Sequence, residues 1–453
     1  MEELSKKSFS SLGLSQWLVD ALASVSIHKP SQIQSSCIPQ ILAGRDCIGG
    51  AKTGSGKTAA FALPILQKWS RDPYGVFALV LTPTRELAIQ ISDQFAALGA
   101  SMDLKFATVV GGLDMLEQSS SLARRPHVVI ATPGRLADII RSNGDETVGG
   151  LRKCQFLVLD EADRLLNPSF ADELEQCMSL LPRDRQTLLF TATITDAIRK
   201  LSQQPGKNGK AAPFLHEVGG EGSLTAVPST LTQGYLFIPS QIRESYLHDL
   251  LSLPKNESKS SIIFVNRTRT AELLRRMLRL LEYRVTALHS DLAQHDRISN
   301  LARFRAGSAT VLIATDVASR GLDIPLVEMV INFDLPRDAD DYIHRVGRTA
   351  RANRPGESIS LVSEHDVDLV HAIESRTGTT MAEYEGCKEA RVLENIHVVG
   401  KAKREAQLGM TDEEFGSRRE RRNEKNGVVK AQSRATPYAR PDRVGKVGGK
   451  SKS

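Results

Sequence analysis

Seven short segments of this 453-residue chain are almost entirely apolar and rich in β-branched residues. A strand that is covered on both faces of its sheet needs such a run, whereas a strand with one wet face alternates apolar and polar residues. Each segment is followed by a loop and a helix-like pattern, as in residues 271–281, where Leu274, Met277 and Leu278 share one stripe. The alternation predicts an α/β fold with parallel sheets. The segments are residues 76–81, 127–131, 156–159 and 187–191 in the first half, and 261–265, 310–314 and 329–333 in the second.

The composition divides the chain into parts. Residues 203–230 interrupt the α/β pattern with Pro-Gly and Gly-rich stretches that are typical of a linker at a domain junction. After about residue 400 the apolar periodicity fades, and the composition predicts a disordered tail. A chain of this length suits two or three domains. We expect an α/β domain at residues 1–205, a linker at 206–226, a second α/β domain at 227–385 and a basic C-terminal extension at 386–453.

The positive charge is concentrated at the C-terminal end. Of the 59 Lys and Arg and the 53 Asp and Glu in the chain, residues 401–453 hold 15 and 7, which leaves 44 and 46 for the rest. A basic tail of this kind binds polyanions without reading their sequence. Residues 401–404 and 418–422 would serve equally as nuclear import signals, so RNA affinity, import and partner binding all stay open for the tail.

Other features exclude some classes of protein. No run of 18 apolar residues is present, and the N-terminal residues lack the apolar stretch of a secretory signal, so we expect no membrane span. The five cysteines show no C-x-x-C spacing, which is typical of free thiols in a reduced intracellular protein. No pattern in the sequence signals oligomerisation, so we expect a monomer.

Two motifs follow apolar segments and carry chemistry. Residues 51–58, Ala-Lys-Thr-Gly-Ser-Gly-Lys-Thr, form a Gly-rich turn of the type that cradles phosphates with backbone N–H groups ahead of a helix. Residues 160–163, Asp-Glu-Ala-Asp, provide an acidic pair that can hold Mg²⁺ and orient an attacking water. Either motif alone arises often by chance, and Ala51 stands where the general pattern has Gly. Together and in this order they predict a nucleotide hydrolase.

Further short segments complete a pattern along the chain. They are Lys-Pro-Ser-Gln-Ile-Gln at residues 29–34, Pro-Thr-Arg-Glu-Leu-Ala at 83–88, Thr-Pro-Gly-Arg at 132–135, Thr-Ala-Thr at 191–193 and His-Arg-Val-Gly-Arg-Thr-Ala-Arg at 344–351. With the two motifs above, this order resembles the DEAD-box RNA helicases over about residues 7–385. The resemblance implies two tandem RecA-like domains, with a Q motif at residues 7–35 in the first. It also implies ATP and Mg²⁺ as cofactors, and RNA-stimulated ATP hydrolysis coupled to local unwinding of RNA duplexes.

The resemblance assigns residues to the nucleotide. Gln34 would recognise adenine, because an amide offers both a donor and an acceptor. Phe9 would stack on the base, and Lys57 would reach the outer phosphates. Asp323 would contact the ribose or hold the catalytic arginines. Further contacts are expected from the rest of the phosphate loop, namely Ala51, Lys52, Thr53, Gly54, Ser55, Gly56 and Thr58.

The resemblance also assigns the catalytic roles. Glu161 would position the attacking water, and Asp160 with Thr58 would hold Mg²⁺. Arg345 and Arg348 would act as arginine fingers, whose charge neutralises the transferred phosphoryl group and is worth roughly 10³–10⁵ in rate. Arginines at a helix start usually form a solvated face, but the spacing in residues 344–351 favours the catalytic interpretation.

Hydroxyl, glycine and arginine positions resemble the RNA track of the family. Such groups suit phosphate and sugar oxygens, and without an obvious aromatic platform they predict backbone contacts with little sequence preference. Contacts to 2′-hydroxyls would favour RNA over DNA. Coupling between the ATP and RNA sites is expected from Asp163, Thr191, Thr193 and His344, although Asp163 also fits a helix cap and Thr191 stands where the family usually has Ser. The track comprises Thr84, Arg85, Gly112, Thr132, Gly134, Arg135, Asn266, Arg267, Gln294, Arg297, Thr315 and Asp316.

Residues 356–374 and the Lys-rich segment after residue 400 resemble the fungal nucleolar branch of the family, which assists assembly of the small (40S) ribosomal subunit. This implies pre-rRNA processing in the nucleus and nucleolus, pre-rRNA or snoRNA duplexes as partners, and room for a stimulatory protein cofactor. Two alternatives stay open: an ATP-gated RNA clamp, or a ribonucleoprotein scaffold in splicing or translation, without processive unwinding. A motor on double-stranded DNA is less well supported, because the Q motif and the DEAD string match the RNA branch.

Overall fold

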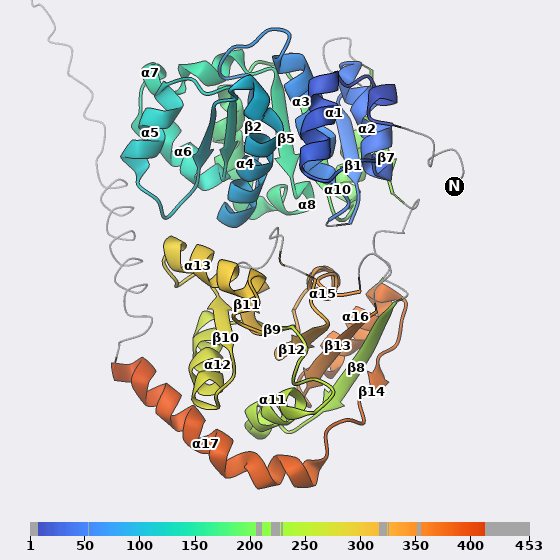
Figure 1. Cartoon of the computed structure of the whole chain (residues 1–453), viewed down its shortest axis with the longest axis vertical. Helices are drawn as coiled ribbons and strands as arrows, with labels where there is room; N and C mark the ends of the chain where they lie inside the picture. The colour runs from blue at the N-terminus through green and yellow to red at the C-terminus, as the bar shows by residue number, and fades with distance from the viewer. Residues whose placement is uncertain are drawn as a thin grey trace, which may run out of the picture.

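The computed structural model describes residues 8–52, 54–204, 211–218, 227, 230–316, 324, 326–350 and 355–412. These residues form two α/β domains, drawn one above the other in Figure 1. Each domain is built on a seven-stranded sheet in which neighbouring strands are parallel. The predicted α/β fold of two tandem domains with parallel sheets is therefore confirmed. In the described part of the chain, no helix is both long enough and apolar enough to cross a membrane.

The first domain contains β1 (Cys47–Gly50), β2 (Ala78–Leu81), β3 (Phe106–Val109), β4 (Val128–Ala131), β5 (Phe156–Asp160), β6 (Gln186–Thr191) and β7 (Phe214–Glu217). Its helices are α1 (Gln16–Ser24), α2 (Gln32–Leu42), α3 (Lys57–Trp69), α4 (Arg85–Gly99), α5 (Met115–Ala123), α6 (Pro133–Ser142), α7 (Asp145–Val148), α8 (Ala162–Leu165), α9 (Ala171–Ser179) and α10 (Asp196–Ser202). The strand order is β3-β4-β2-β5-β6-β1-β7.

The second domain contains β8 (Leu231–Phe237), β9 (Ser261–Val265), β10 (Val285–Leu288), β11 (Val311–Thr315), β12 (Met329–Asn332), β13 (Gly356–Val362) and β14 (Ala382–Glu383). Its helices are α11 (Arg243–Ser252), α12 (Thr268–Leu280), α13 (Gln294–Arg305), α15 (Ala339–Val346), α16 (Val367–Thr377) and α17 (Glu389–Asp412). The strand order is β10-β11-β9-β12-β13-β8-β14.

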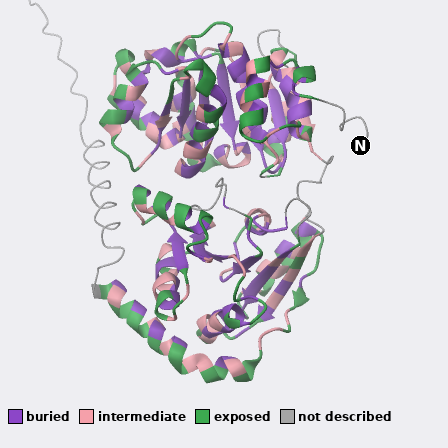
Figure 2. Ribbon diagram, viewed as in Figure 1, coloured by how far each residue is buried: buried purple, intermediate pink, exposed green. Residues whose placement is uncertain are grey.

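The apolar sequence runs lie where helices cover both faces of a sheet. Every residue of β2, β4 and β5 is buried, and so is every residue of β9 and β11. Figure 2 shows these buried strands between helices that expose their outer sides. Because parallel strands end at a common edge, the loops after the neighbouring strands β5, β6 and β1 come together there. The same holds for the loops after β11, β9 and β12 in the second domain.

One domain boundary differs from the expected one. Strand β7 lies inside the expected linker 206–226, and it pairs with β1 from Cys47–Phe214 to Gly50–Glu217. The first domain therefore reaches residue 218. A four-residue edge strand between two Gly- and Pro-containing stretches gives too short a pattern for the sequence to reveal, and its pairing with β1 lies far away along the chain.

The C-terminal extension also differs from the expected tail, because α17 belongs to the second domain. Val392, Val399 and Ala406 join the apolar core that α11 and α12 share. Arg391 donates hydrogen bonds to the fully buried carboxylate of Asp249, with Nη2 at 2.8 Å from Oδ2. The sequence hides this helix because its buried stripe has few large apolar side chains, while Leu393, Val398 and Leu408 stay exposed and blur the apolar periodicity. The part of the predicted tail beyond residue 412 lies outside the described residues.

Removing α17 should therefore destabilise the second domain. A protein truncated after residue 388 loses the partner of a buried carboxylate and uncovers apolar surface, and we expect its free energy of unfolding to fall by about 3 kcal/mol or more. A protein truncated after residue 412 is the matched control and should change by less than about 0.5 kcal/mol. Urea unfolding of both proteins measures the difference. Equal stabilities would show that α17 adds nothing to the domain.

Candidate nucleotide and RNA site

The phosphate loop joins the end of β1 to the start of α3. Gly54 and Gly56 have positive φ angles of 78° and 88°, which glycine adopts at no steric cost. A Cβ at position 56 would lie 2.3 Å from Nε2 of Gln34, so a larger residue there would displace the Gln34 side chain. Lys57 begins α3, and its Nζ donates to the carbonyl oxygen of Ala51 at 2.5 Å. The loop therefore presents a buried ammonium beside a helix N-terminus, an arrangement that suits phosphate.

The acidic pair stands at the end of β5. Asp160 is the last residue of the strand, and its Oδ1 accepts the N–H of Glu161 at 3.1 Å. Glu161 has a φ of 53°, a strained conformation of the kind that gathers at functional sites. Burial raises the pKa of Asp160 to about 6, against a lowering effect of Lys57. Burial, with the charges of Asp163 and Asp160, raises the pKa of Glu161 to about 7.

Asp160 and Thr58 line one cavity and fit a magnesium ion. Within the described residues, no cluster of three or more His, Cys, Asp or Glu could hold a metal alone. A cation here would take its other ligands from nucleotide phosphates and water, which is how Mg²⁺ is usually held. The buried carboxylate of Asp160 would be stabilised by such a charge.

The loop after β6 is tied to the acidic motif. Thr193 donates its hydroxyl to Asp163 Oδ2 at 2.6 Å, and its N–H points to the same oxygen at 3.2 Å. Thr191 donates its hydroxyl to the carbonyl oxygen of Thr193 at 2.7 Å, so the threonine at this position keeps a hydroxyl contact. His344, the other expected coupling residue, lies in the second domain on α15. Any rearrangement around Asp163 would thus reach the loop after β6.

The two expected adenine contacts behave differently. Gln34 lines the cavity, accepts the N–H of Ser31 at 2.9 Å and donates to the carbonyl oxygen of Gly56 at 3.1 Å. Phe9 is 2% exposed and belongs to the apolar core of the first domain. Stacking on a base needs an accessible ring face, so the structure does not support that role for Phe9.

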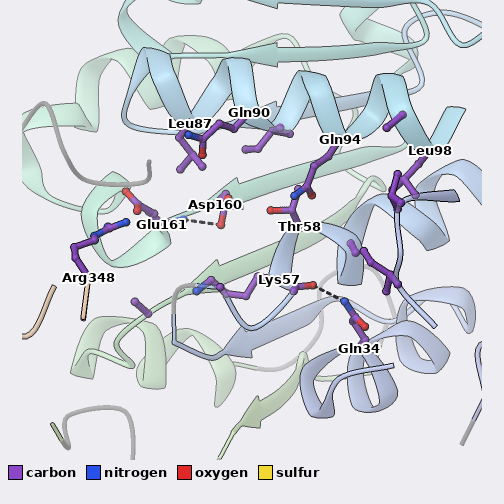
Figure 3. A pocket seen from close by; sticks show the side chains of 18 residues that line it. Gln34, Lys57, Thr58, Leu87, Gln90, Gln94, Leu98, Asp160, Glu161 and Arg348 are labelled. Carbon is purple, nitrogen blue, oxygen red and sulfur yellow. Dashed lines mark hydrogen bonds between the residues drawn. The ribbon is translucent and has the colours of Figure 1, made fainter. Parts of the chain in front are cut away.

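The phosphate loop, the acidic pair and Arg348 line a common cavity of about 400 Å³ (Figure 3). Lys57, Thr58, Asp160 and Glu161 line it from the first domain, and Arg348 lines it from the second. Figure 3 shows Arg348 beside Glu161, at the opposite end from Leu98. One wall of the cavity is apolar, and the sequence did not reveal it. Several of its residues lie on α4, where they recur at helical spacing after residue 86. The wall comprises Val25, Ile27, Leu87, Ile91, Ala97 and Leu98, with Gln90 and Gln94 among them.

Arg345 does not reach this cavity, which corrects its expected role as a finger. Its side chain is 1% exposed and donates to both carboxylate oxygens of Asp316 at 2.6 Å. It also donates to Oδ1 of Asn266 at 2.9 Å and to the carbonyl oxygen of Asp334 at 2.6 Å. These contacts occupy the guanidinium inside the second domain. Asp323 and Thr53, expected at the nucleotide, lie outside the described residues.

The expected RNA residues of the first domain gather at the loops after β2, β3 and β4. Thr84 and Thr132 are the N-caps of α4 and α6, and Gly134 lies in the first turn of α6. The guanidinium of Arg85 lies against the glycines after β3, where a Cβ at Gly112 would meet Nη1 at 2.4 Å. The track therefore offers helix N-termini and a pair of glycines, both of which suit phosphates.

The expected RNA residues of the second domain stand at comparable places. Arg267 is the N-cap of α12, Gln294 begins α13, and Thr315 ends β11. Asn266 and Asp316 are the partners of Arg345, so they shape the track through that arginine.

A buried contact between the domains joins the two halves of this track. Glu86 accepts from Nε2 of Gln294 and pairs with Nη2 of Arg297, each at 2.9 Å. The Cβ of Gln294 also lies 3.6 Å from the place of a Cβ at Gly112. The sequence did not predict this contact of Glu86 with the second domain, because a glutamate in the first turn of a helix ordinarily stabilises the helix dipole.

Two parallel-sheet domains, with a phosphate loop and acidic pair on one and an arginine from the other at the same cavity, define a RecA-like ATPase. A family model for the DEAD/DEAH box helicase matches residues 31–201, and one for the helicase conserved C-terminal domain matches residues 243–353. The chain is 65% identical over 434 residues to an ATP-dependent RNA helicase, dbp8, of Schizosaccharomyces pombe, covering 94% of this chain and 95% of that protein. It is 53% identical over 426 residues to DBP8 of Saccharomyces cerevisiae, covering 93% and 99%.

Solved structures of RNA-bound proteins share the fold of this chain. A variant of S. cerevisiae Dbp5 bound to RNA and ADP BeF3 superposes with a TM-score of 0.73 at 31% identity, covering 87% of this chain and 99% of that one. Mss116p bound to single-stranded RNA and AMP-PNP gives 0.74 at 27% identity, covering 87% and 82%. The chain belongs to the DEAD-box family of ATP-dependent RNA helicases. It is an enzyme that uses ATP and acts on RNA.

Proposed function

We propose that this helicase unwinds short RNA duplexes of pre-rRNA in the nucleolus, during maturation of the small ribosomal subunit. The cavity carries the hydrolytic part of the proposal, because Glu161 and Arg348 line it from different domains. The choice of pre-rRNA is supported by residues 356–374 and the following basic segment, which resemble the nucleolar branch. A monomeric state, and stimulation by a protein cofactor, belong to the same proposal.

The catalytic steps follow from the residues at the cavity. Lys57 neutralises the outer phosphates of ATP at the start of α3. Thr58 and Asp160 would hold Mg²⁺, which supplies charge neutralisation and orients the phosphates when bound. Glu161 orients the attacking water and accepts its proton. Arg348 approaches the γ-phosphate from the second domain and stabilises the charge that develops during transfer.

Coupling to RNA follows from the contact between the domains. ATP holds both domains because its phosphates lie between Lys57 and Arg348. Closure joins the two halves of the RNA track through Glu86 and Arg297, and the joined track bends a bound strand so that neighbouring base pairs open. Loss of the γ-phosphate removes the shared contact, and the domains separate.

Two measurements with purified protein, and a third in cells, test this function. ATP hydrolysis should rise strongly when single-stranded RNA is added, and a short RNA duplex should be separated in the presence of ATP. Stimulation without strand separation would favour the RNA clamp. In cells, RNA cross-linked to the Glu161→Gln variant should be enriched in pre-rRNA and snoRNA. Enrichment of spliceosomal RNA or messenger RNA would contradict the nucleolar assignment.

The raised carboxylate pKa values predict a pH dependence. Glu161 accepts a proton only when it is ionised, and its pKa is raised to about 7. We expect kcat/KM for ATP to fall as the pH drops through about 7, and to level off above it. Asp160, with a pKa of about 6, should add a second fall that higher Mg²⁺ concentrations displace to lower pH. Steady-state rates between pH 5.5 and 9 give the profile, and a flat profile would exclude Glu161 as the base.

A further inference from the structure

The loops that precede the strands of the first sheet lie at the edge opposite the nucleotide cavity, which the loops after the strands form. Strands β3, β4, β2 and β5 are parallel neighbours in that order, so the loops before them also lie side by side. Figure 1 shows α7, which leads toward β5, on the far side of the first domain from α13 of the second. These loops therefore belong neither to the nucleotide cavity nor to the proposed RNA track.

Contacts between three of these loops hold them in one surface. A Cβ at Gly75 would lie 1.9 Å from the carbonyl oxygen of Arg125, so the loops before β2 and β4 touch through their backbones. A Cβ at Gly150 would lie 3.6 Å from Cγ of Arg125, so that side chain also reaches the loop before β5. The hydroxyl of Tyr74 donates to the carbonyl oxygen of Lys153 at 3.0 Å. The three loops thus have fixed positions relative to one another.

The loop before β4 has an unusual backbone and also holds the loop before β3. Arg125 has a φ of 54°, a left-handed conformation that costs free energy for a residue with a Cβ. The N–H of Lys105 donates to Nδ1 of His127 at 3.0 Å, which joins the loops before β3 and β4. Strained residues of this kind gather at functional positions, which directs attention to what this edge carries.

The three central loops carry positive charge only. Residues 73–77, 124–127 and 149–155 contain four Arg or Lys and no Asp or Glu. These four basic residues are exposed, and an exposed lysine of the loop before β3 continues the row. Because neighbouring strands lie about 4.8 Å apart, the row extends over roughly 15 Å of the domain edge. This row, the basic edge, consists of Lys105, Arg124, Arg125, Arg152 and Lys153.

Little of this charge is neutralised inside the protein. Lys105 and Arg152 each pair with an exposed aspartate, at 3.9 and 2.9 Å. Exposed pairs contribute little free energy, so an arriving phosphate can replace the carboxylate. Among the described residues, the other two arginines and Lys153 form no ion pair. The basic edge therefore presents guanidinium and ammonium groups that are available to an anionic partner.

We propose that the basic edge is a second RNA-binding surface, which holds a double-stranded segment of the RNA on which the enzyme acts. A row of arginine and lysine suits the phosphates of an RNA helix, which proteins contact without reading sequence. A protein partner fits less well, because the three central loops expose no large apolar side chain for the centre of an interface. The whole edge lies in one domain, so binding there needs neither ATP nor domain closure.

Binding of two labelled RNAs by the full-length protein tests this surface. One is a blunt duplex of about 16 base pairs without nucleotide, and the other is an oligouridylate of about six nucleotides with a non-hydrolysable ATP analogue. The variant Arg124→Ala/Lys153→Ala should bind the duplex roughly tenfold more weakly and the oligouridylate equally well. Its slope of log K against log salt for the duplex should be smaller by about 0.7–0.9 per lost phosphate contact. Its Tm should not change, because both residues are exposed.

Two further variants separate the basic edge from other sources of RNA affinity. Arg303→Ala/Lys388→Ala removes one exposed arginine and one exposed lysine from the second domain and should bind the duplex normally. An equal loss in this control would show that only net charge matters, and would overturn the proposal. Arg135→Ala should weaken oligouridylate and not the duplex, so failure of the proposed track is seen separately. Unchanged duplex binding by the basic-edge variant would also overturn the proposal, and would leave an acidic protein as the partner of this surface.

Discussion

Replacement of Glu161 by Gln should slow RNA-stimulated ATP hydrolysis by at least about a hundredfold while ATP and RNA stay bound. The amide keeps the shape of the side chain but cannot accept a proton from water. It also removes one negative charge from beside Asp160 and Asp163, so affinity for ATP should not fall. Hydrolysis in a single turnover and the rate of RNA release with ATP present are the two measurements.

The release rate decides whether hydrolysis opens the domains. The Gln variant should hold RNA much longer with ATP than with ADP, because the γ-phosphate persists between the domains. Glu405→Gln, an exposed position on α17, provides the matched control and should behave as the unchanged protein. If the Glu161→Gln variant released RNA as fast with ATP as with ADP, the domains would not depend on the γ-phosphate for closure.

Replacement of Arg348 by Ala should lower kcat by roughly a thousandfold, with a much smaller effect on the Kd for ATP. Arg348 lines the cavity beside Glu161, and its charge acts mainly on the phosphoryl group in transfer. Arg348→Lys keeps a charge without the planar fork and should recover only part of the rate. Separate measurements of kcat and of ATP binding are needed. A loss confined to binding would mean that Arg348 holds the ground state only.

Replacement of Arg345 by Ala should lower stability rather than kcat. Arg345→Ala leaves the carboxylate of Asp316 without its partner and opens a buried network, so we expect the second domain to lose roughly 3–5 kcal/mol of stability. Thermal unfolding of Arg345→Ala should show a lower Tm than that of the unchanged protein. An Arg345→Ala protein with normal Tm and a thousandfold lower kcat would restore Arg345 as a finger.

The sequence predicts the two sheets and the meeting of the loops after β1, β5 and β6 well, because both follow from local patterns. Buried parallel strands leave apolar runs, and the common edge of a sheet brings their ends together. The spacing of residues 344–351 could not separate the roles of Arg345 and Arg348. What separates them is that Arg345 is the last but one residue of α15 and faces Asp316 and Asn266, whereas Arg348 lies beyond the helix end.

Other features depend on partners that no local pattern encodes. Glu86 is buried because α13 of the second domain places Gln294 and Arg297 against it, more than 200 positions away along the chain. In the same way α17 is fixed by Asp249, which Arg391 reaches from 142 positions further on. Charged residues such as these are usually assigned to the surface, so their burial becomes visible only when the chain is folded.

The hydrogen bonds of Lys57 have a consequence for how the phosphate loop meets anions. Its ammonium already donates to the carbonyl oxygens of Ala51 and Lys52, at 2.5 and 3.1 Å. An arriving phosphate must compete with these internal acceptors, so a lone phosphate or sulfate ion gains little by binding. A nucleotide can offset that exchange with contacts along the rest of the cavity. We therefore expect inorganic phosphate and sulfate to compete only weakly with ATP for the phosphate loop.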